Sequence, residues 1–160
     1  MPKEKRRFHI RTMTIEDIPA IPALLKFCDL FRESGDTAEN LKRKLAYDPD
    51  LTVVAVIEDK LIGCMMASYD GWAATIWHYG IPPKFHSMGV ARALEKEVHK
   101  RIMHKHRILS RKAGVGEGEN LKVYGLILSD KKAVLRLLTH KGFSRGPEVF
   151  VVCHDTAEDP

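Results

Sequence analysis

A short segment between two apolar stretches has the residue types and spacing of an anion-binding turn. The segment IPPKFHSMGVARAL, residues 81–94, begins like the end of a strand, passes through two prolines and enters a helical pattern behind Gly89. Apolar residues then recur every four positions, at Val90, Leu94, Val98 and Ile102. This period predicts an amphipathic helix that begins at or near Gly89. A helix N-terminus presents unpaired N–H groups, and a glycine lets a phosphate approach them, although a glycine before a helix is also common turn chemistry.

The cysteines and clustered histidines offer no comparable pattern. Three cysteines, Cys28, Cys64 and Cys153, lie far apart in the sequence, without the close spacings of zinc or redox motifs. We expect them to be small buried apolar residues in a reducing compartment. The histidines at 99, 104 and 106 lie close together, but no neighbouring Cys or acidic residue completes a ligand set, so we expect no metal.

Composition predicts one compact domain covering residues 1–160, because the chain has 160 residues, of which 44% are apolar. No apolar run reaches the length of a membrane span and no signal peptide is recognisable, so we expect a cytoplasmic protein that does not bind membranes. The formal net charge is +5. The basic run at residues 99–112 lacks aromatic residues that would stack on bases, so we expect a solvated face and no nucleic acid partner.

The elements around the turn follow from periodicity. Residues 8–14 alternate like a strand, Thr14 to Asp17 form a capping box for a first helix, and Pro22 indicates a kink or a late start there. A second helix is predicted at residues 37–46. Three strands at 51–59, 60–70 and 72–81 form a meander, with turns at residues 58–60 and at Asp70-Gly71.

The elements behind the turn are a frayed helix end and mobile loop at residues 104–120, a strand at 121–130, a helix at 131–143 and a closing strand at 148–155. Ser129 or Asp130 can cap the helix at 131–143, and Gly142 can end it.

This order and these motifs resemble the GNAT superfamily of N-acetyltransferases over nearly the whole chain. The family's acetyl-CoA motif, V-x-P-x-x-Q/R-x-x-G-x-G/A, has counterparts at Ile81, Pro83, His86, Gly89 and Ala91. Residues 134–143 resemble the family's later motif. The stretches CDLFRESGD, ENLKRKLAYDPDL and ASYDG resemble a YpeA-like branch of small bacterial acetyltransferases.

The resemblance implies an α/β (α+β) fold, with a mostly antiparallel mixed sheet of about six to seven strands flanked by about four helices. It implies acetyl-CoA as co-substrate, with the pantetheine arm placed like an added strand between residues 74–81 and 121–128. It also implies a set of cofactor-binding residues, namely Tyr79, Gly80, Ile81, His86, Ser87, Met88, Gly89, Val90, Ala91, Arg92 and Asp130.

The chain departs from the family's pattern at His86, which replaces a Gln or Arg. Its reference pKa of about 6.5 would leave it largely uncharged at neutral pH, whereas a bound pyrophosphate favours the protonated form. We therefore expect cofactor affinity to fall as pH rises. Alternatively, His86 is a loop residue exposed to water, and Arg92 with the basic helix end supplies the charge.

The usual catalytic groups of the family are also missing. Leu138 stands where many members have a tyrosine that protonates the leaving thiolate, and Lys131 or, after a shift of one residue, Asp130 stands at the usual asparagine. Either another donor, such as Tyr69, Tyr79 or water, then supplies that proton, or activity is low. Trp77 and Thr75 occupy the usual general-base positions, and neither can act as a base.

Other residues are candidates for these roles by their place in the family's fold. His78 has suitable chemistry, but strand alternation turns it toward the helices unless a bulge re-aims it. Asp70 lies at the turn before the strand at 72–81, and Asp36 lies in the loop between the first two helices. In the family, substrate enters at both places, although Asp70 is also explained as a plain Asp-Gly turn. The catalytic candidates are thus Tyr79, His78 and Asp70, and the substrate-binding candidates are Asp36, Tyr69 and Trp77.

The acceptor implied by the resemblance is a primary amine of a small molecule, amino acid, peptide or protein. A lysine amine with a pKa of about 10.4 pays roughly 4.6 kcal/mol to be neutral at pH 7, against about 1.4 kcal/mol for an α-amine near 8. We therefore expect a less basic amine. A non-catalytic acyl-CoA-binding or regulatory domain is the alternative, and the sequence is compatible with a homodimer.

Overall fold

The computed structural model describes residues 7–116 and 121–125, together with the single residues 132, 136, 139, 140 and 144. The chain divides into two compact units, residues 1–126 and 127–160, and the elements below belong to the first. The helix predicted at 131–143, apart from isolated positions, and the strand predicted at 148–155 lie outside the described residues. The prediction of a single domain stays a prediction.

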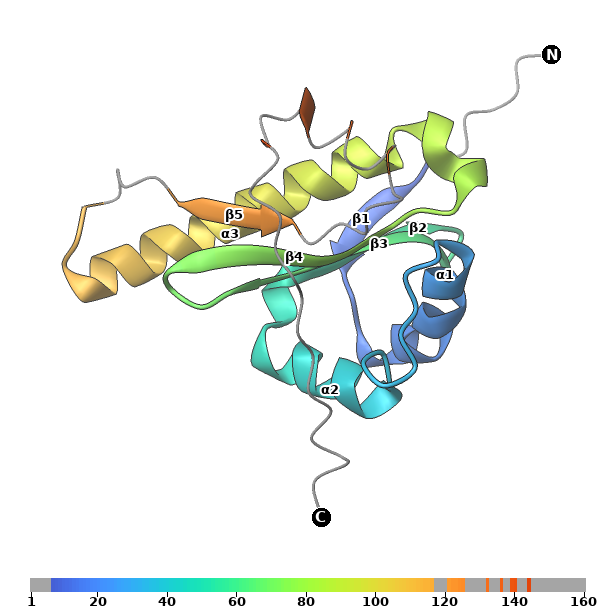
Figure 1. The fold of residues 1–160 in the computed structure, drawn as a ribbon, viewed down its shortest axis with the longest axis horizontal. Coiled ribbons are helices and arrows are strands. Elements are labelled where there is room, and N and C mark those ends of the chain that lie inside the picture. Colours follow the sequence, from blue (N-terminus) through green and yellow to red (C-terminus); the bar gives the residue numbers. More distant parts are fainter. Residues whose placement is uncertain are drawn as a thin grey trace. The chain divides into compact units, whose positions relative to one another are not determined.

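One mixed sheet organises the first unit (Figure 1). Its strands follow the order β1-β2-β3-β4-β5, and they are β1 (His9–Thr12), β2 (Thr52–Ile57), β3 (Lys60–Tyr69), β4 (Ala73–Gly80) and β5 (Lys122–Gly125). The first four pair antiparallel and β5 pairs parallel to β4, which confirms a mostly antiparallel mixed sheet. The expected count of six to seven strands is wrong for the described residues, which form five, because the predicted closing strand falls outside them.

Both predicted turns of the meander are confirmed. Glu58 and Asp59 have φ of 46° and 61°, so a two-residue turn with both residues in the left-handed region joins β2 to β3. Gly71 has φ 94° in the turn between β3 and β4, where the Asp70 carboxylate accepts the N–H groups of Trp72 and Ala73. The side chain of Asp70 therefore stabilises the turn directly.

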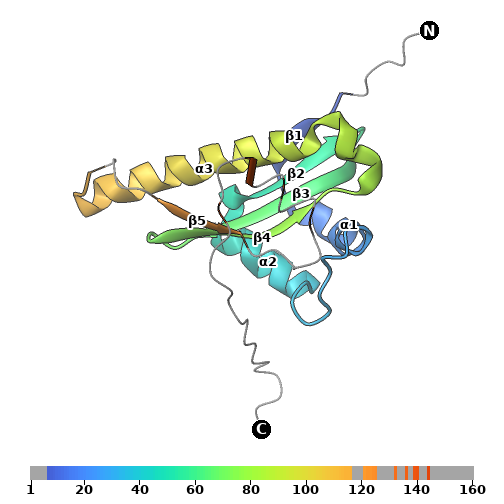
Figure 2. The same cartoon turned by 45° about the horizontal axis from the view of Figure 1, so that its top comes forward.

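Helices η1 (Ile15–Ala20), α1 (Ile21–Phe27) and α2 (Ala38–Tyr47) pack on one face of the sheet (Figure 2). The capping box at Thr14 is present, and the late helix start indicated by Pro22 is confirmed, because α1 begins one residue before it. Their apolar side chains form a buried cluster with the sheet that comprises Met13, Ile18, Ile21, Leu24, Leu25, Leu41, Val54, Val56, Cys64 and Met66.

The helix α3 (Val90–Ala113) covers the opposite face. The predicted period is confirmed, since Val90, Leu94, Val98 and Ile102 are all buried. The expected frayed end from residue 104 onward was wrong, because the helix continues to Ala113 and ends at Gly114, whose φ is 69°. Contacts of Lys105 with Asp48 and of His106 with Tyr69 anchor this last part.

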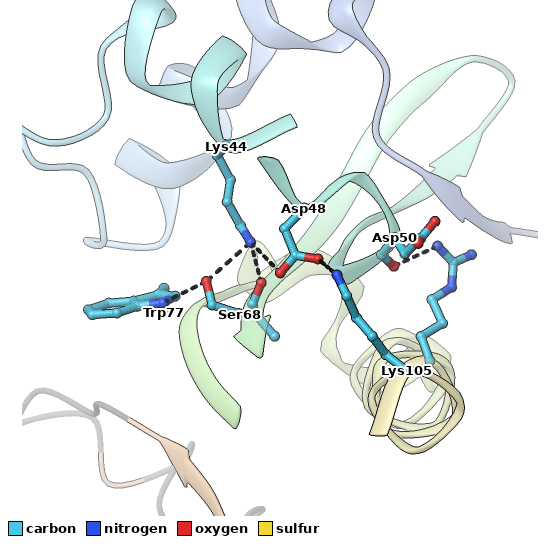
Figure 3. A network of polar contacts seen from close by, with 8 residues as sticks. Lys44, Asp48, Asp50, Ser68, Trp77 and Lys105 are labelled. Atoms are coloured by element: carbon cyan, nitrogen blue, oxygen red, sulfur yellow. Dashed lines mark hydrogen bonds and ion pairs between the residues drawn. The ribbon is translucent and has the colours of Figure 1, made fainter. Parts of the chain in front are cut away.

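A buried carboxylate links the helices of the two faces (Figure 3). Asp48 has no exposed surface, and it forms ion pairs with Lys44 of α2, at 3.3 Å, and with Lys105 of α3. Lys44 Nζ also donates to the Ala67 carbonyl at 2.5 Å and to Ser68 Oγ at 3.2 Å. Burial lowers the pKa of Lys44, and the neighbouring Asp48 carboxylate opposes that shift.

The structure also bears on the predictions for the cysteines, for metal ligands and for membrane spans. Cys64 is fully buried, and burial raises the pKa of its thiol to about 12, whereas Cys28 is half-buried and Cys153 lies outside the described residues. In the described part of the chain, no three His, Cys, Asp or Glu side chains group as a metal site. No helix there is long and apolar enough to cross a membrane.

Candidate functional site

The turn between β4 and α3 has the backbone expected of an anion site. The 3-10 helix η3 (Pro83–Met88) leads to Gly89, whose φ of 79° disfavours any other residue. The first helical bond runs from Ala93 N–H to the Gly89 carbonyl at 3.1 Å, so the preceding amides have no partner within the helix. A Cβ at Gly89 would meet nothing within 4 Å, and the first turn of α3 carries no acidic residue. These features fit a diphosphate such as that of coenzyme A.

His86 closes this turn through the backbone. Its Nε2 lies 2.7 Å from the Ile81 carbonyl oxygen. A carbonyl can only accept, so Nε2 carries a proton and donates it. The imidazole is exposed to solvent, as one of the sequence interpretations had it. His86 therefore holds the strand end and η3 together.

A buried glycine, Gly63, and a half-buried tyrosine, Tyr79, set the position of the turn on the sheet. A Cβ on Gly63 of β3 would lie 3.1 Å from Ile81 Cγ1 and 3.2 Å from Val90 Cγ1, so the turn packs directly on a glycine. Tyr79 donates its hydroxyl to the Ala91 carbonyl at 2.6 Å. Burial, followed by the charge of Glu95, raises the pKa of Tyr79. The Tyr79 hydroxyl is thus engaged in holding the first turn of α3.

The end of β4 extends beyond its described pairing with β5. The register runs from Ala73 opposite Lys122 to Ile76 opposite Gly125, and residues 77–80 continue past it. The expected separation of the two strands would fall at residues 126–130, outside the described residues. Asp130, Lys131 and Leu138 lie outside them as well.

An imidazole and a carboxylate meet beside this strand end. His78 Nε2 lies 2.7 Å from Asp36 Oδ1, and the other carboxylate oxygen accepts the Arg32 N–H at 2.8 Å. The two side chains are only 12% and 8% exposed. Because Asp36 receives the proton on Nε2, Nδ1 is the basic position of a neutral His78 ring. The pair has the composition and geometry of an oriented general base.

A bulge in β4 brings Trp77 to the same face. Met66 pairs with His78 and Ala67 with Ile76, which leaves Trp77 as the extra residue. Its indole N–H donates to Ser68 Oγ at 3.1 Å, on the side of α2, and its side chain is about half exposed. His78 faces the loop before α2 despite the bulge that the sequence interpretation considered. Asp36, Trp77 and His78 are therefore neighbours on one face.

The structure brings neither Tyr69 nor Asp70 to that group, and the Tyr79 hydroxyl is engaged with Ala91. Tyr69 is buried on the α3 face, where its hydroxyl lies 2.7 Å from His106 Nδ1 and donates to the Gly71 carbonyl. Burial, then the charge of Asp70, raises its pKa. Asp70 lies at the opposite end of β4 from Gly80, and the N–H groups of Ala73 and Trp72 lower its pKa, which weakens it as a base.

Sequence reasoning selected His78 and Asp36 separately and missed that they are partners. The residues are 42 positions apart, and no local spacing signals the contact. Gly80 gives a partial reason for it, since a Cβ there would lie 3.3 Å from Leu30 Cδ1 and 3.4 Å from Cys28 Sγ. This glycine lets the chain behind α1 lie against β4, from where it continues to Asp36.

The mixed sheet, the turn at Gly89 behind its fourth strand and the His78–Asp36 pair fit a domain that binds a diphosphate-containing ligand beside an oriented imidazole. Comparison with known proteins identifies the family. The profile described as "Acetyltransferase (GNAT) family" matches residues 19–127. The chain belongs to this acyltransferase family.

Curated relatives are named acetyltransferases. An acetyltransferase of Pectobacterium atrosepticum is 34% identical over 94 residues, which is 59% of this chain and 67% of the relative. One of Photorhabdus laumondii is 32% identical over 94 residues, 59% of this chain and 66% of the relative. The matched part of the chain thus spans about two thirds of the length of these relatives.

Solved structures show the same fold. Ard1 of Thermoplasma volcanium superimposes with a TM-score of 0.66 at 17% identity, over 88% of this chain and 84% of that one. The PaiA N-acetyltransferase of Thermoplasma acidophilum, solved with coenzyme A, superimposes with a TM-score of 0.66 at 16% identity. The match covers 86% of this chain and 90% of that one. At such identity these similarities show the fold alone.

Proposed function

We propose that this chain is an acetyl-CoA-dependent N-acetyltransferase that moves an acetyl group to a primary amine of a small molecule, an amino acid or a protein N-terminus. The observation that carries the proposal is the 2.7 Å contact between His78 and Asp36 beside the strand that leads to the Gly89 turn. A base and a diphosphate site on one strand are the two elements that direct acetyl transfer requires. Its relation to the YpeA-like branch stays a sequence-based prediction.

In the proposed binding mode, the amides of Val90, Ala91 and Arg92 hold the diphosphate of acetyl-CoA. The exposed Ser87 and His86 line the same turn, and Met88 is half-exposed there. The backbone of Tyr79, Gly80 and Ile81 is the segment along which the pantetheine arm would extend. The Ile81 carbonyl already accepts His86, so the Ile81 N–H is the group from this residue that remains to polarise the thioester.

In the proposed reaction, the acceptor amine attacks the thioester carbonyl carbon while His78 Nδ1 takes a proton from the nitrogen. The new C–N bond forms, the C–S bond breaks, and the thiolate of coenzyme A leaves and takes up a proton from solvent or from the protonated His78. Asp36 keeps the ring oriented and stabilises its charged form. Trp77 presents a half-exposed aromatic surface next to this base, where the acceptor would rest.

The chemistry of a single imidazole favours a weakly basic acceptor. It can take the proton of an attacking amine, but it does not remove the cost of about 4.6 kcal/mol for neutralising a lysine side chain at pH 7. An α-amine, at about 1.4 kcal/mol, is the better acceptor. The buried Asp36 is engaged with His78 and Arg32 N–H, so it offers no free carboxylate to a lysine ammonium.

The test combines binding with turnover. Thermal unfolding with acetyl-CoA, with coenzyme A and ATP as controls, should show stabilisation by both coenzyme A forms, because ligand at about 100 times its Kd adds about 2.7 kcal/mol. Gly89→Glu should abolish the shift. A panel of α-amines, amino acids and lysine peptides then reports release of coenzyme A, with α-amines acetylated fastest.

A non-catalytic acyl-CoA-binding domain is the second candidate, and one observation favours it. The Tyr79 hydroxyl donates to the Ala91 carbonyl, so this phenol is not directed toward a leaving thiolate. Stabilisation by acetyl-CoA with no release of coenzyme A for any amine would establish this candidate. No thermal stabilisation by acetyl-CoA would overturn both candidate functions.

A further inference from the structure

The helix α3 carries a continuous basic face that the proposed reaction does not use. Exposed residues recur every three or four positions along it, and this face consists of Lys96, His99, Lys100, His104, Arg107 and Arg111. Such spacing places them on one side of a helix. Across α3, which the structure describes throughout, none of the exposed residues is acidic. We call this surface the α3 basic face.

The cations of α3 fall into two groups that differ in their partners. Toward the sheet, Lys105 pairs with Asp48, and Arg101 pairs with Glu97 at 2.8 Å. On the α3 basic face, Lys96, Lys100 and Arg107 have no ion pair or hydrogen bond with another described residue. Their charge is therefore not neutralised within the described part of the chain, and it is available to an external polyanion.

We propose that the α3 basic face binds the phosphate backbone of a nucleic acid duplex. The helix has 24 residues and is therefore about 36 Å long, close to one turn of a duplex. Lys96 and Lys100 lie about 6 Å apart along the rigid helix axis and Arg107 follows about 10 Å further on, a row that suits regularly spaced phosphates better than an irregular acidic protein surface.

The same face excludes two other modes of binding. No aromatic residue lies on it, so bases cannot stack there, and backbone contacts without sequence preference remain. The apolar side of α3 is buried against the sheet, and Ile108 is its one exposed large apolar residue. A membrane-surface helix needs an accessible apolar side, which α3 lacks. The sequence interpretation took the basic run as a solvated face without stacking aromatic residues, and the structure separates the paired cations Arg101 and Lys105 from those of the α3 basic face.

The experiment measures binding of fluorescent duplex DNA and RNA of about 20 base pairs by anisotropy as salt is raised. We expect log K to fall against log salt with a slope of about −3 to −4, because three or four phosphates are neutralised. The triple variant K96E/K100E/R107E should weaken binding at least about 30-fold and flatten this slope. The milder K96Q/K100Q/R107Q serves if charge reversal impairs folding.

The matched control is K42E/R43E/K60E, which changes net charge by the same amount at exposed cations of α2 and β3. It should leave binding within about threefold. Equal weakening by both triples would overturn the proposal, because net charge alone would then explain binding. It would also be overturned by absence of duplex binding at low salt, or by equal or tighter binding to phosphatidylserine vesicles or polyglutamate. Since the readout is not acetylation, this test is independent of the proposed reaction.

Discussion

The Asp36 carboxylate connects a loop to a strand: Oδ1 lies 2.7 Å from His78 Nε2 of β4, and Oδ2 accepts the Arg32 N–H at 2.8 Å. Asp36 also donates its own N–H to the Arg32 carbonyl at 2.8 Å. The side chain that orients the imidazole therefore also shapes the loop between α1 and α2, so its loss should affect stability as well as activity.

We expect Asp36→Ala to lower the free energy of unfolding by about 1–3 kcal/mol, because a buried imidazole and a backbone N–H lose their acceptor. Urea unfolding measures this change. Glu33→Ala, at an exposed position in the same loop, is the control and should change stability by less than about 0.5 kcal/mol. Equal effects of the two variants would mean that the contacts of Asp36 contribute nothing to stability.

Asp17 predicts a pH dependence of stability. Its carboxylate accepts hydrogen bonds from both terminal nitrogens of Arg11, at 2.6 and 2.8 Å, and from the Thr14 N–H. The hydrogen bonds from Arg11 come first among the causes that lower its pKa. A carboxyl whose folded pKa is depressed stabilises the fold above its unfolded pKa of about 3.9, and that stability is lost as pH falls through the folded pKa.

Asp17→Asn should therefore cost about 1–2 kcal/mol at pH 7, a figure kept low because Arg11 is partly exposed. The difference in the free energy of unfolding between Asp17→Asn and the wild type should shrink progressively below about pH 4. Chemical denaturation at pH 7, 5, 4 and 3 tests this, and a difference that stays constant over that range would contradict it.

Gly63 tests how the turn proposed to bind the diphosphate is supported. In Gly63→Ala, the new methyl would press on Ile81 and Val90 at 3.1 and 3.2 Å and on the Gly80 carbonyl at 3.3 Å. We expect a loss of about 1–2 kcal/mol in stability from overpacking, and weaker stabilisation by acetyl-CoA because the turn shifts. Gly116→Ala, where a Cβ meets nothing within 4 Å, is the control. Unchanged binding in Gly63→Ala would show that the turn tolerates the shift.

Asp48→Ala should be the most destabilising of these substitutions, at about 3 kcal/mol, because it leaves Lys44 and Lys105 without their shared buried counter-charge. Thermal and urea unfolding measure this effect. The exposed Asp50→Ala is the control, since only the main-chain carbonyl of Asp50 contacts Arg101. A loss below about 1 kcal/mol would indicate that both lysines reach water without cost.

The sequence predicted the elements well where local signals were strong. The four-residue period after Gly89, the capping box at Thr14 and the two turns of the meander each depend on neighbouring residues, so they were legible without the fold. The end of α3 could not be predicted in this way, because the residues beyond 104 are mainly polar and basic. Their helix is held by long-range contacts, such as Lys105 with Asp48 and His106 with Tyr69.

The candidate site was predicted as a set of residue types and not as an arrangement. The Gly89 turn is local and was found directly, whereas the partnership of His78 with Asp36 depends on chain packing between Gly80 and Cys28. The bulge at Trp77 has no signal in the sequence, because the extra residue is defined only by its partner strand. The same limitation grouped Tyr69 with Asp36, although the sheet separates them.

The most direct test of the proposed function is acetylation of an α-amine peptide by the wild type and by His78→Gln, followed through release of coenzyme A. We predict that kcat/KM for the amine falls about 10²- to 10⁴-fold in His78→Gln, the range for loss of a general base. The thermal stabilisation by acetyl-CoA should be unchanged, since His78 lies outside the turn at Gly89 that we propose for the diphosphate. Wild-type kcat/KM in His78→Gln would contradict the assignment of His78 as the base.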